Sequence, residues 1–217
     1  MMNAQTVELA AAAARLVVEE GMEYAQAKRK AARAVASRAA LPSNEAVETE
    51  VRSYLALYCA DTQPAELRAL RRLALRCMLR LAEFRPHLGG AAWRGTATRL
   101  SSLHLDLYCD DPKAMAISLI NLGIAYDSAS LPGSHRGEPV NLLSFAEPCA
   151  ELGEPVTLHL AVRDLDDLRG ALKPDAQGRS WRGDASALRR LLEAQTNPGA
   201  RRAAPRANTG VRSTKVL

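Results

Sequence analysis

Two histidines of this chain occupy the same local setting, a Leu-His-Leu triplet inside a run of alternating apolar and polar residues. His104 lies in the run Ser102–Tyr108 and His159 in the run Pro155–Arg163, and each alternation predicts a half-buried strand. Asp106 follows His104 by two positions and therefore shares its face. If the two strands are neighbours, two imidazoles and a carboxylate would suit zinc, manganese or a phosphate group. The alternative, which we favour, is that both histidines are surface or hydrogen-bonded strand residues.

A turn bounded by two glycines precedes the strand of His104. It reads Gly90-Ala91-Ala92-Trp93-Arg94-Gly95, and Ser101-Ser102-Leu103-His104-Leu105 follows after a short gap. This pattern resembles the signature of the nucleotidyltransferase fold, the DNA polymerase beta superfamily in its minimal bacterial form, in which a Gly-Ser turn is followed by Asp-x-Asp at the start of a strand. With its helical first part, the chain is similar to an uncharacterised proteobacterial group that carries this fold.

The resemblance implies that a nucleoside triphosphate and a divalent metal, magnesium or manganese, are the cofactors. In the family, backbone donors of the turn hold the triphosphate and strand carboxylates hold the metal. The candidate nucleotide-binding residues are Gly90, Arg94, Gly95, Thr96, Arg99 and Ser102. Asp106 and His104 are the candidate catalytic residues, and both, with His159, are the candidate metal ligands.

The chain departs from the family pattern at the metal site. Ser102 and His104 stand where the family has its two aspartates, and Ala91 stands where the family has serine. Asp127, or a residue near His159, could supply the third carboxylate of the family. Because magnesium prefers oxygen ligands to imidazole, these changes predict a degenerate metal site and argue against standard two-metal transfer.

Other chemistries have less support. Residues 95–99 carry neither the second glycine nor the lysine of a Walker loop, which excludes a P-loop ATPase or an ATP-dependent ligase. No Gly-x-Ser-x-Gly elbow is present, so hydrolase chemistry is disfavoured. His135 with Arg136 is a minor candidate for an anion contact, and His87 has no partner that the sequence identifies.

The first 86 residues are expected to be wholly helical. Apolar residues at helical spacing predict four helices joined by short loops, which would form a small bundle or a pair of helical hairpins. The expected ranges are about Val7 to Glu20, Glu23 to Ala39, Asn44 to Tyr58 and Pro64 to Arg85.

After Gly89-Gly90 the pattern changes to short strands and helices. Further strands are expected at Ile124–Asp127 and Val140–Phe145, and helices at 111–122, 164–172 and 184–194. The fold class is therefore α+β, with a helical domain at 1–86, a nucleotidyltransferase-like α/β domain with a mixed sheet at 87–195 and a disordered basic tail at 196–217.

The net charge of +5 belongs to the tail. Residues 1–86 carry 13 basic and 10 acidic side chains, residues 87–195 carry 11 and 14, and residues 196–217 carry five and none. The charge is thus no argument for a nucleic-acid-binding fold. The tail would contribute only weak, nonspecific contact with nucleic acid.

Composition limits the remaining classes. With 217 residues, 24% charged and 47% hydrophobic, the chain is typical of globular proteins, and 4% aromatic residues give little support to a base-stacking platform. The four cysteines form no Cys-x-x-Cys pair, which argues against a disulfide framework and a zinc knuckle. Without a run of 18 apolar residues, no membrane span is expected, and we expect a cytoplasmic protein.

Three functions follow from these patterns. The first is a nucleotidyltransferase-like protein with a degenerate metal site that either binds a nucleotide or another phosphate ligand or keeps only the scaffold. The second is an active but divergent nucleotidyltransferase. The third is a protein-interaction module in which the N-terminal helices bind a protein partner and the α/β half is structural. Whether the chain is an enzyme stays open at this point.

Overall fold

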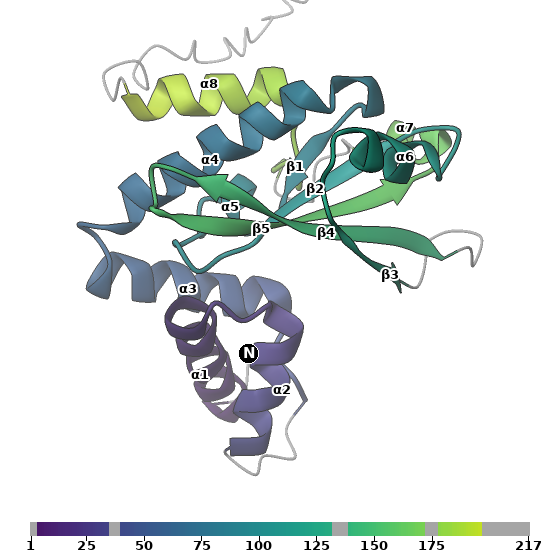
Figure 1. The fold of residues 1–217 in the computed structure, drawn as a ribbon. Helices are drawn as coiled ribbons and strands as arrows, with labels where there is room; N and C mark the ends of the chain where they lie inside the picture. The colour runs from purple at the N-terminus through teal and green to yellow at the C-terminus, as the bar shows by residue number, and fades with distance from the viewer. Residues whose placement is uncertain (1–3, 35–39, 132–138, 172–177, 197–217) are drawn as a thin grey trace, which may run out of the picture.

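The computed structural model describes residues 4–34, 40–131, 139–171 and 178–196, and it confirms the α+β class with helices at the N-terminus (Figure 1). The helices are α1 (Ala4–Glu20), α2 (Tyr24–Ala34), α3 (Asn44–Tyr58), α4 (Gln63–Arg80), α5 (Gly90–Arg94), α6 (Ala114–Asn121), α7 (Leu168–Ala171) and α8 (Ala185–Thr196). Two 3-10 turns, η1 (Ala82–Phe84) and η2 (Leu165–Asp167), precede β1 and α7. The strands are β1 (His87–Gly89), β2 (Leu103–Tyr108), β3 (Asp127–Leu131), β4 (Val140–Cys149) and β5 (Glu154–Arg163).

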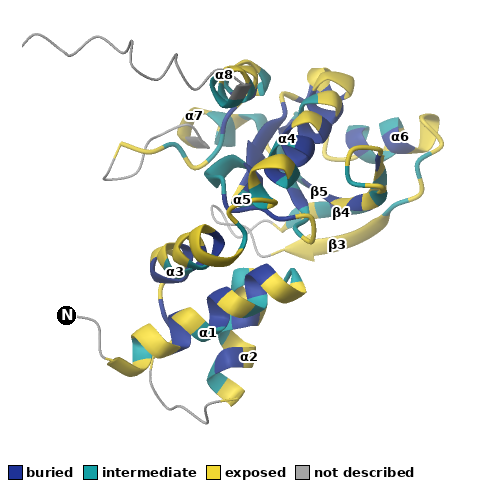
Figure 2. Ribbon diagram, turned by 90° about the vertical axis from the view of Figure 1, so that its left-hand side faces the viewer, coloured by how far each residue is buried: buried dark blue, intermediate teal, exposed yellow. Residues whose placement is uncertain are grey.

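The described strands form one mixed sheet in the order β1-β2-β5-β4-β3. Strands β2 and β5 are parallel, and the other neighbouring pairs are antiparallel. The parallel register sets His104 opposite His159. Figure 2 shows that β3, at one edge, is exposed along its whole length.

One face of the sheet is the core of the α/β half. Leu103, Leu105 and Leu107 of β2 and Leu158 and Leu160 of β5 are at most 1% exposed. They pack in one cluster with apolar residues of α4, α6 and α8. Because strand side chains alternate, the polar residues between these leucines point to the opposite face, where α1, α2 and α3 lie (Figure 1).

The sequence predicts a bundle of four helices, whereas in the structure only three of these helices share one core. Helices α1, α2 and α3 share a core of their own, hereafter the helical unit, in which small residues such as Ala13 and Ala27 let the helices approach closely. Leu70, Leu73 and Met78 of α4 belong instead to the core between α4 and the sheet. An apolar stripe indicates that one face of a helix is buried. It does not show whether that face packs against another helix or against a sheet. The domain boundaries proposed from the sequence remain predictions.

Several element bounds differ from expectation. Strand β3 begins at Asp127, where the expected strand 124–127 ends, and β1 and α5 were not expected at all. The second helix is described to Ala34, and the rest of its expected range lies outside the described residues, as do His135, Arg136 and the tail from residue 197. The four cysteines are free thiols. In the described part of the chain, no helix is long and apolar enough to cross a membrane.

Candidate functional site

A cavity of about 260 Å³ lies where the helical unit meets the Gly90 turn and the start of β2. From the turn and the strand, it is lined by five of the residues selected from the sequence: Gly90, Arg94, Thr96, Ser102 and His104. The helical unit contributes further wall residues, including Glu23, Tyr24 and Glu48, and the loop residue Trp181 also lines the cavity. The candidates Gly95, Arg99, Asp106 and His159 do not line this cavity.

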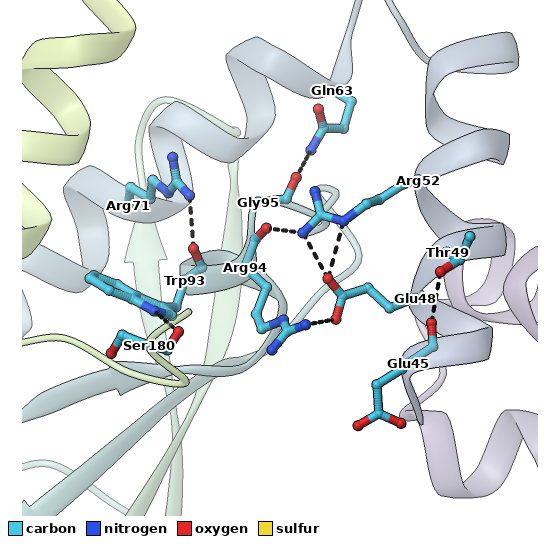
Figure 3. Close-up of polar contacts among 10 residues, drawn as sticks. All are labelled: Glu45, Glu48, Thr49, Arg52, Gln63, Arg71, Trp93, Arg94, Gly95 and Ser180. Carbon is cyan, nitrogen blue, oxygen red and sulfur yellow. Dashed lines mark hydrogen bonds and ion pairs between the residues drawn. The ribbon is translucent and has the colours of Figure 1, made fainter. Parts of the chain in front are cut away.

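The Gly90 turn passes directly over His104. Gly90 has φ +63°, and a Cβ at this position would lie 3.2 Å from the His104 ring, so both its backbone conformation and its surroundings favour glycine. From α4, the buried Arg71 donates a hydrogen bond to the carbonyl of Ala92 (2.8 Å). It donates a second one to the carbonyl of Trp93 (3.0 Å), which Figure 3 shows. A guanidinium buried beneath the turn therefore fixes the backbone that shapes the cavity.

His104 is bonded to a carboxylate from the helical unit. Its Nε2 lies 2.9 Å from Glu23 Oε1, and the Ser102 hydroxyl donates to the same oxygen over 2.8 Å. The hydrogen bond with His104 is the main cause that lowers the pKa of Glu23 to about 2. Ser102 and Glu23 both meet the same ring nitrogen, so the three do not form a nucleophile–base–acid relay, in which the two ring nitrogens have separate partners.

The two histidines stack in the structure. Their ring centroids are 5.0 Å apart, and His159 Nδ1 lies 2.8 Å from the hydroxyl of Ser144 on β4. Burial lowers the pKa of His159, and the neighbouring His104 ring adds to the effect. His159 lines a second hollow of about 340 Å³ together with Arg99, which is paired with Glu154 over 2.9 Å.

Asp106 is held by two arginines. Arg163 of β5 pairs with one carboxylate oxygen, and Arg182 lies 2.9 Å from the other and also donates to the Tyr108 hydroxyl. A carboxylate held in this way does not fit the metal-ligand set implied by the resemblance. Among the residues that the structure describes, no three His, Cys, Asp or Glu side chains are grouped so that they could hold a metal ion. The metal-binding roles of Asp106, His104 and His159 therefore remain predictions. Asp127, the possible third carboxylate, is exposed on the edge strand β3.

Arg94 joins the turn to the helical unit. It forms an ion pair with Glu48 of α3, and the two side chains are only 10% and 8% exposed. Arg52 bonds the same carboxylate over 2.7 Å and donates to the Arg94 carbonyl over 2.6 Å (Figure 3). The Arg94 guanidinium also lies 4.3 Å from the ring centroid of Trp181, a cation–π contact. The Arg94 guanidinium is therefore engaged both by the Glu48 carboxylate and by the Trp181 ring.

The sequence patterns did not point to the cavity residues outside the turn and the strand, among them Glu23, Trp181 and Glu48. Glu23 contacts His104, which lies 81 positions later in the sequence, and no local sequence pattern predicts such a contact. Trp181 lies in a loop without periodicity. Glu48 could have been recognised from the sequence. It lies three positions before Val51 and seven before Leu55, and therefore on the buried stripe of α3. A charge on a buried stripe indicates a buried partner.

Comparison with known proteins gives a limited result. No family model and no curated protein matches this chain. Among solved structures, it is similar to Cid1 with its short product ApU (14% identity, 70% of this chain, 42% of that chain, TM-score 0.34). It is also similar to a cytoplasmic RNA terminal U-transferase (14%, 71%, 43%, 0.33) and to the Cid1 poly(U) polymerase with MgGTP (13%, 54%, 38%, 0.33).

This chain thus spans less than half the length of the structures that it matches. Their TM-scores are too low to carry activity, substrates or partners over to this chain.

Proposed function

We propose that this chain is a nucleotidyltransferase-like protein that binds a nucleotide or a related phosphate ligand beside the Gly90 turn and does not carry out standard two-metal transfer. One observation carries the proposal. The two positions that the resemblance assigns to metal-binding aspartates hold Ser102 and His104, and both are bonded to Glu23 from the helical unit. The same two residues line the cavity, which supports the binding of a ligand, or of part of one, where the resemblance would place a metal pair.

The surroundings of the turn support a binding role. The cavity has Thr96, Ser101 and Ser102 on its wall, residue types that hydrogen-bond to a ligand without a metal. The nearest carboxylate on the strand, Asp106, is already held by two guanidinium groups. The tail lies outside the described residues, and we propose for it only a salt-sensitive, nonspecific attraction to anionic partners.

The test is a nucleotide titration followed through tryptophan fluorescence, since Trp181 lines the cavity. ATP and CTP are titrated in EDTA, in Mg²⁺ and in Mn²⁺, and pyrophosphate release is measured in parallel. We expect binding in EDTA, a Kd that changes little with either metal, and no pyrophosphate. Metal-dependent pyrophosphate release would support the active divergent nucleotidyltransferase instead. Absence of binding under all three conditions would sink both nucleotide functions and leave the interaction module.

The interaction module has one observation in its favour. Leu57 and Tyr58, at the end of α3 in the helical unit, are 71% and 66% exposed. Two apolar side chains form a small patch, so this function ranks below ligand binding.

A further inference from the structure

The cavity is small for a whole nucleotide. At about 260 Å³ it falls below the ~300–1,000 Å³ that is usual for pockets that enclose drug-sized ligands. A ligand with several phosphates would therefore place only one part inside. Which part enters is decided by the side chains on the wall.

The wall offers no uncommitted positive charge to a phosphate. Among the described residues that line the cavity, Arg94 is the sole lysine or arginine, and its guanidinium is engaged by Glu48 and by the Trp181 ring. Glu23 and Glu45 add further carboxylates to the same wall. A phosphate entering the cavity would meet these carboxylates without a free cation to compensate its charge.

The remaining wall suits an uncharged ring. Val17, Met22, Tyr24 and Trp181 supply apolar and aromatic surface from both sides of the cavity. Apolar walls with a few fixed polar groups are the usual composition of a site for a heterocyclic ligand.

Glu45 supplies a hydrogen-bond acceptor on this wall. It lies in the first turn of α3, where the position favours a negative charge. Its own backbone N–H and the Ser43 hydroxyl lower its pKa, so it is a carboxylate at neutral pH. A carboxylate accepts hydrogen bonds and donates none, and it therefore favours a ligand with an N–H donor edge.

We propose that the cavity binds an uncharged, amino-bearing aromatic ring, as in an aminopurine or aminopyrimidine nucleoside, and leaves any phosphate outside. The inference rests on the proposed function, because it takes this cavity as the nucleotide site. The protein would recognise the ligand through its base, and the phosphates would contribute little to the affinity.

The test compares adenosine, ATP and purine riboside by calorimetry on the full chain in EDTA. Adenosine and ATP should bind within about threefold of each other. Purine riboside, in which hydrogen replaces the amino group and no other N–H donor stands on that edge of the ring, should bind at least about fivefold more weakly, because a hydrogen bond to a charged acceptor is lost. Glu45→Gln should weaken adenosine binding by a similar factor. Glu50→Gln, a matched change on α3 away from the cavity, should leave it unchanged.

The outcomes separate the two proposals. ATP binding more than tenfold tighter than adenosine would show that phosphate is recognised, which would overturn the inference and leave the proposed function intact. Equal affinity for purine riboside and adenosine would overturn the amino-donor part, and this comparison on the unaltered chain does not depend on the folding of a variant. If neither adenosine nor ATP binds, the proposed function itself fails.

Discussion

Replacing Arg94 by methionine tests whether a buried ion pair holds the helical unit against the Gly90 turn. The side chains of Arg94 and Glu48 are 10% and 8% exposed, so the substitution leaves Glu48 buried without its buried partner. Breaking a buried pair from one side typically costs about 3–5 kcal/mol. Arg52 keeps two hydrogen bonds to Glu48, so we expect a loss just below this range, about 2–3 kcal/mol in the free energy of unfolding.

Urea unfolding followed by far-ultraviolet circular dichroism and tryptophan fluorescence measures this loss. The double variant Arg94→Met with Glu48→Leu removes both charges and should recover most of the stability, because the burial cost of the carboxylate disappears. Arg15→Met is the matched control: Arg15 pairs with Glu19 on the surface and should leave the free energy of unfolding almost unchanged. If Arg94→Met costs no more than Arg15→Met, or if the double variant loses the sum of the single losses, the reasoning is refuted.

Three further predictions concern the rest of the site. The pKa of Glu23 is about 2, below its ordinary 4.5, so its contact with His104 stabilises the fold above pH 4.5 and loses this effect as the pH falls through 2. For this half-exposed pair we expect about 1 kcal/mol between wild type and Glu23→Gln at pH 5–6, vanishing near pH 2 in unfolding experiments. Gly183→Ala would place a Cβ 2.0 Å from the Trp93 ring, and we expect a loss of at least about 2 kcal/mol by urea unfolding. Asp106→Asn should cost about 2–3 kcal/mol, because two guanidinium groups lose their carboxylate, while calorimetric nucleotide affinity stays unchanged.

Each of these has a contradicting result. A difference between wild type and Glu23→Gln that persists at pH 2 would show that the carboxylate charge is not the source of the stability. Gly170→Ala, where a Cβ meets nothing within 4 Å, is the control for Gly183→Ala, and equal effects of the two would contradict the steric argument. Loss of nucleotide affinity in stably folded Asp106→Asn would restore the metal-ligand role expected from the sequence.

The strands that carry the site could be predicted because one face of each strand is buried. Burial on a single face imposes a period of two, and the run from Ser102 to Tyr108 shows that period with leucine at every second position. The alternation gave both the range of β2 and the face of His104. Strand β1 has only three residues, His87–Gly89, which is too short for a period to appear. It is held by pairing with β2, a contact between distant residues.

The partners across the site could not be predicted because they depend on packing. The stripe of α4 indicated burial but not the sheet as its partner. The stacking of His104 on His159 required the parallel pairing of β2 with β5, which the sequence left open. The contact between His104 and Glu23 requires the turn after α1 to reach the start of β2. There, Gly21 comes so close to Leu100 that a Cβ would lie 2.6 Å from its carbonyl oxygen.

The number of metal ions bound together with a nucleotide decides between ligand binding and two-metal transfer. Mn²⁺ is titrated into the full chain in the presence of saturating ATP, and free and bound ions are distinguished by electron paramagnetic resonance. We expect no Mn²⁺ beyond the ion that ATP itself carries, because Ser102 and His104 stand where the resemblance places metal-binding carboxylates and Asp106 is held by arginines. Two Mn²⁺ ions for each bound ATP, accompanied by pyrophosphate release, would contradict this expectation.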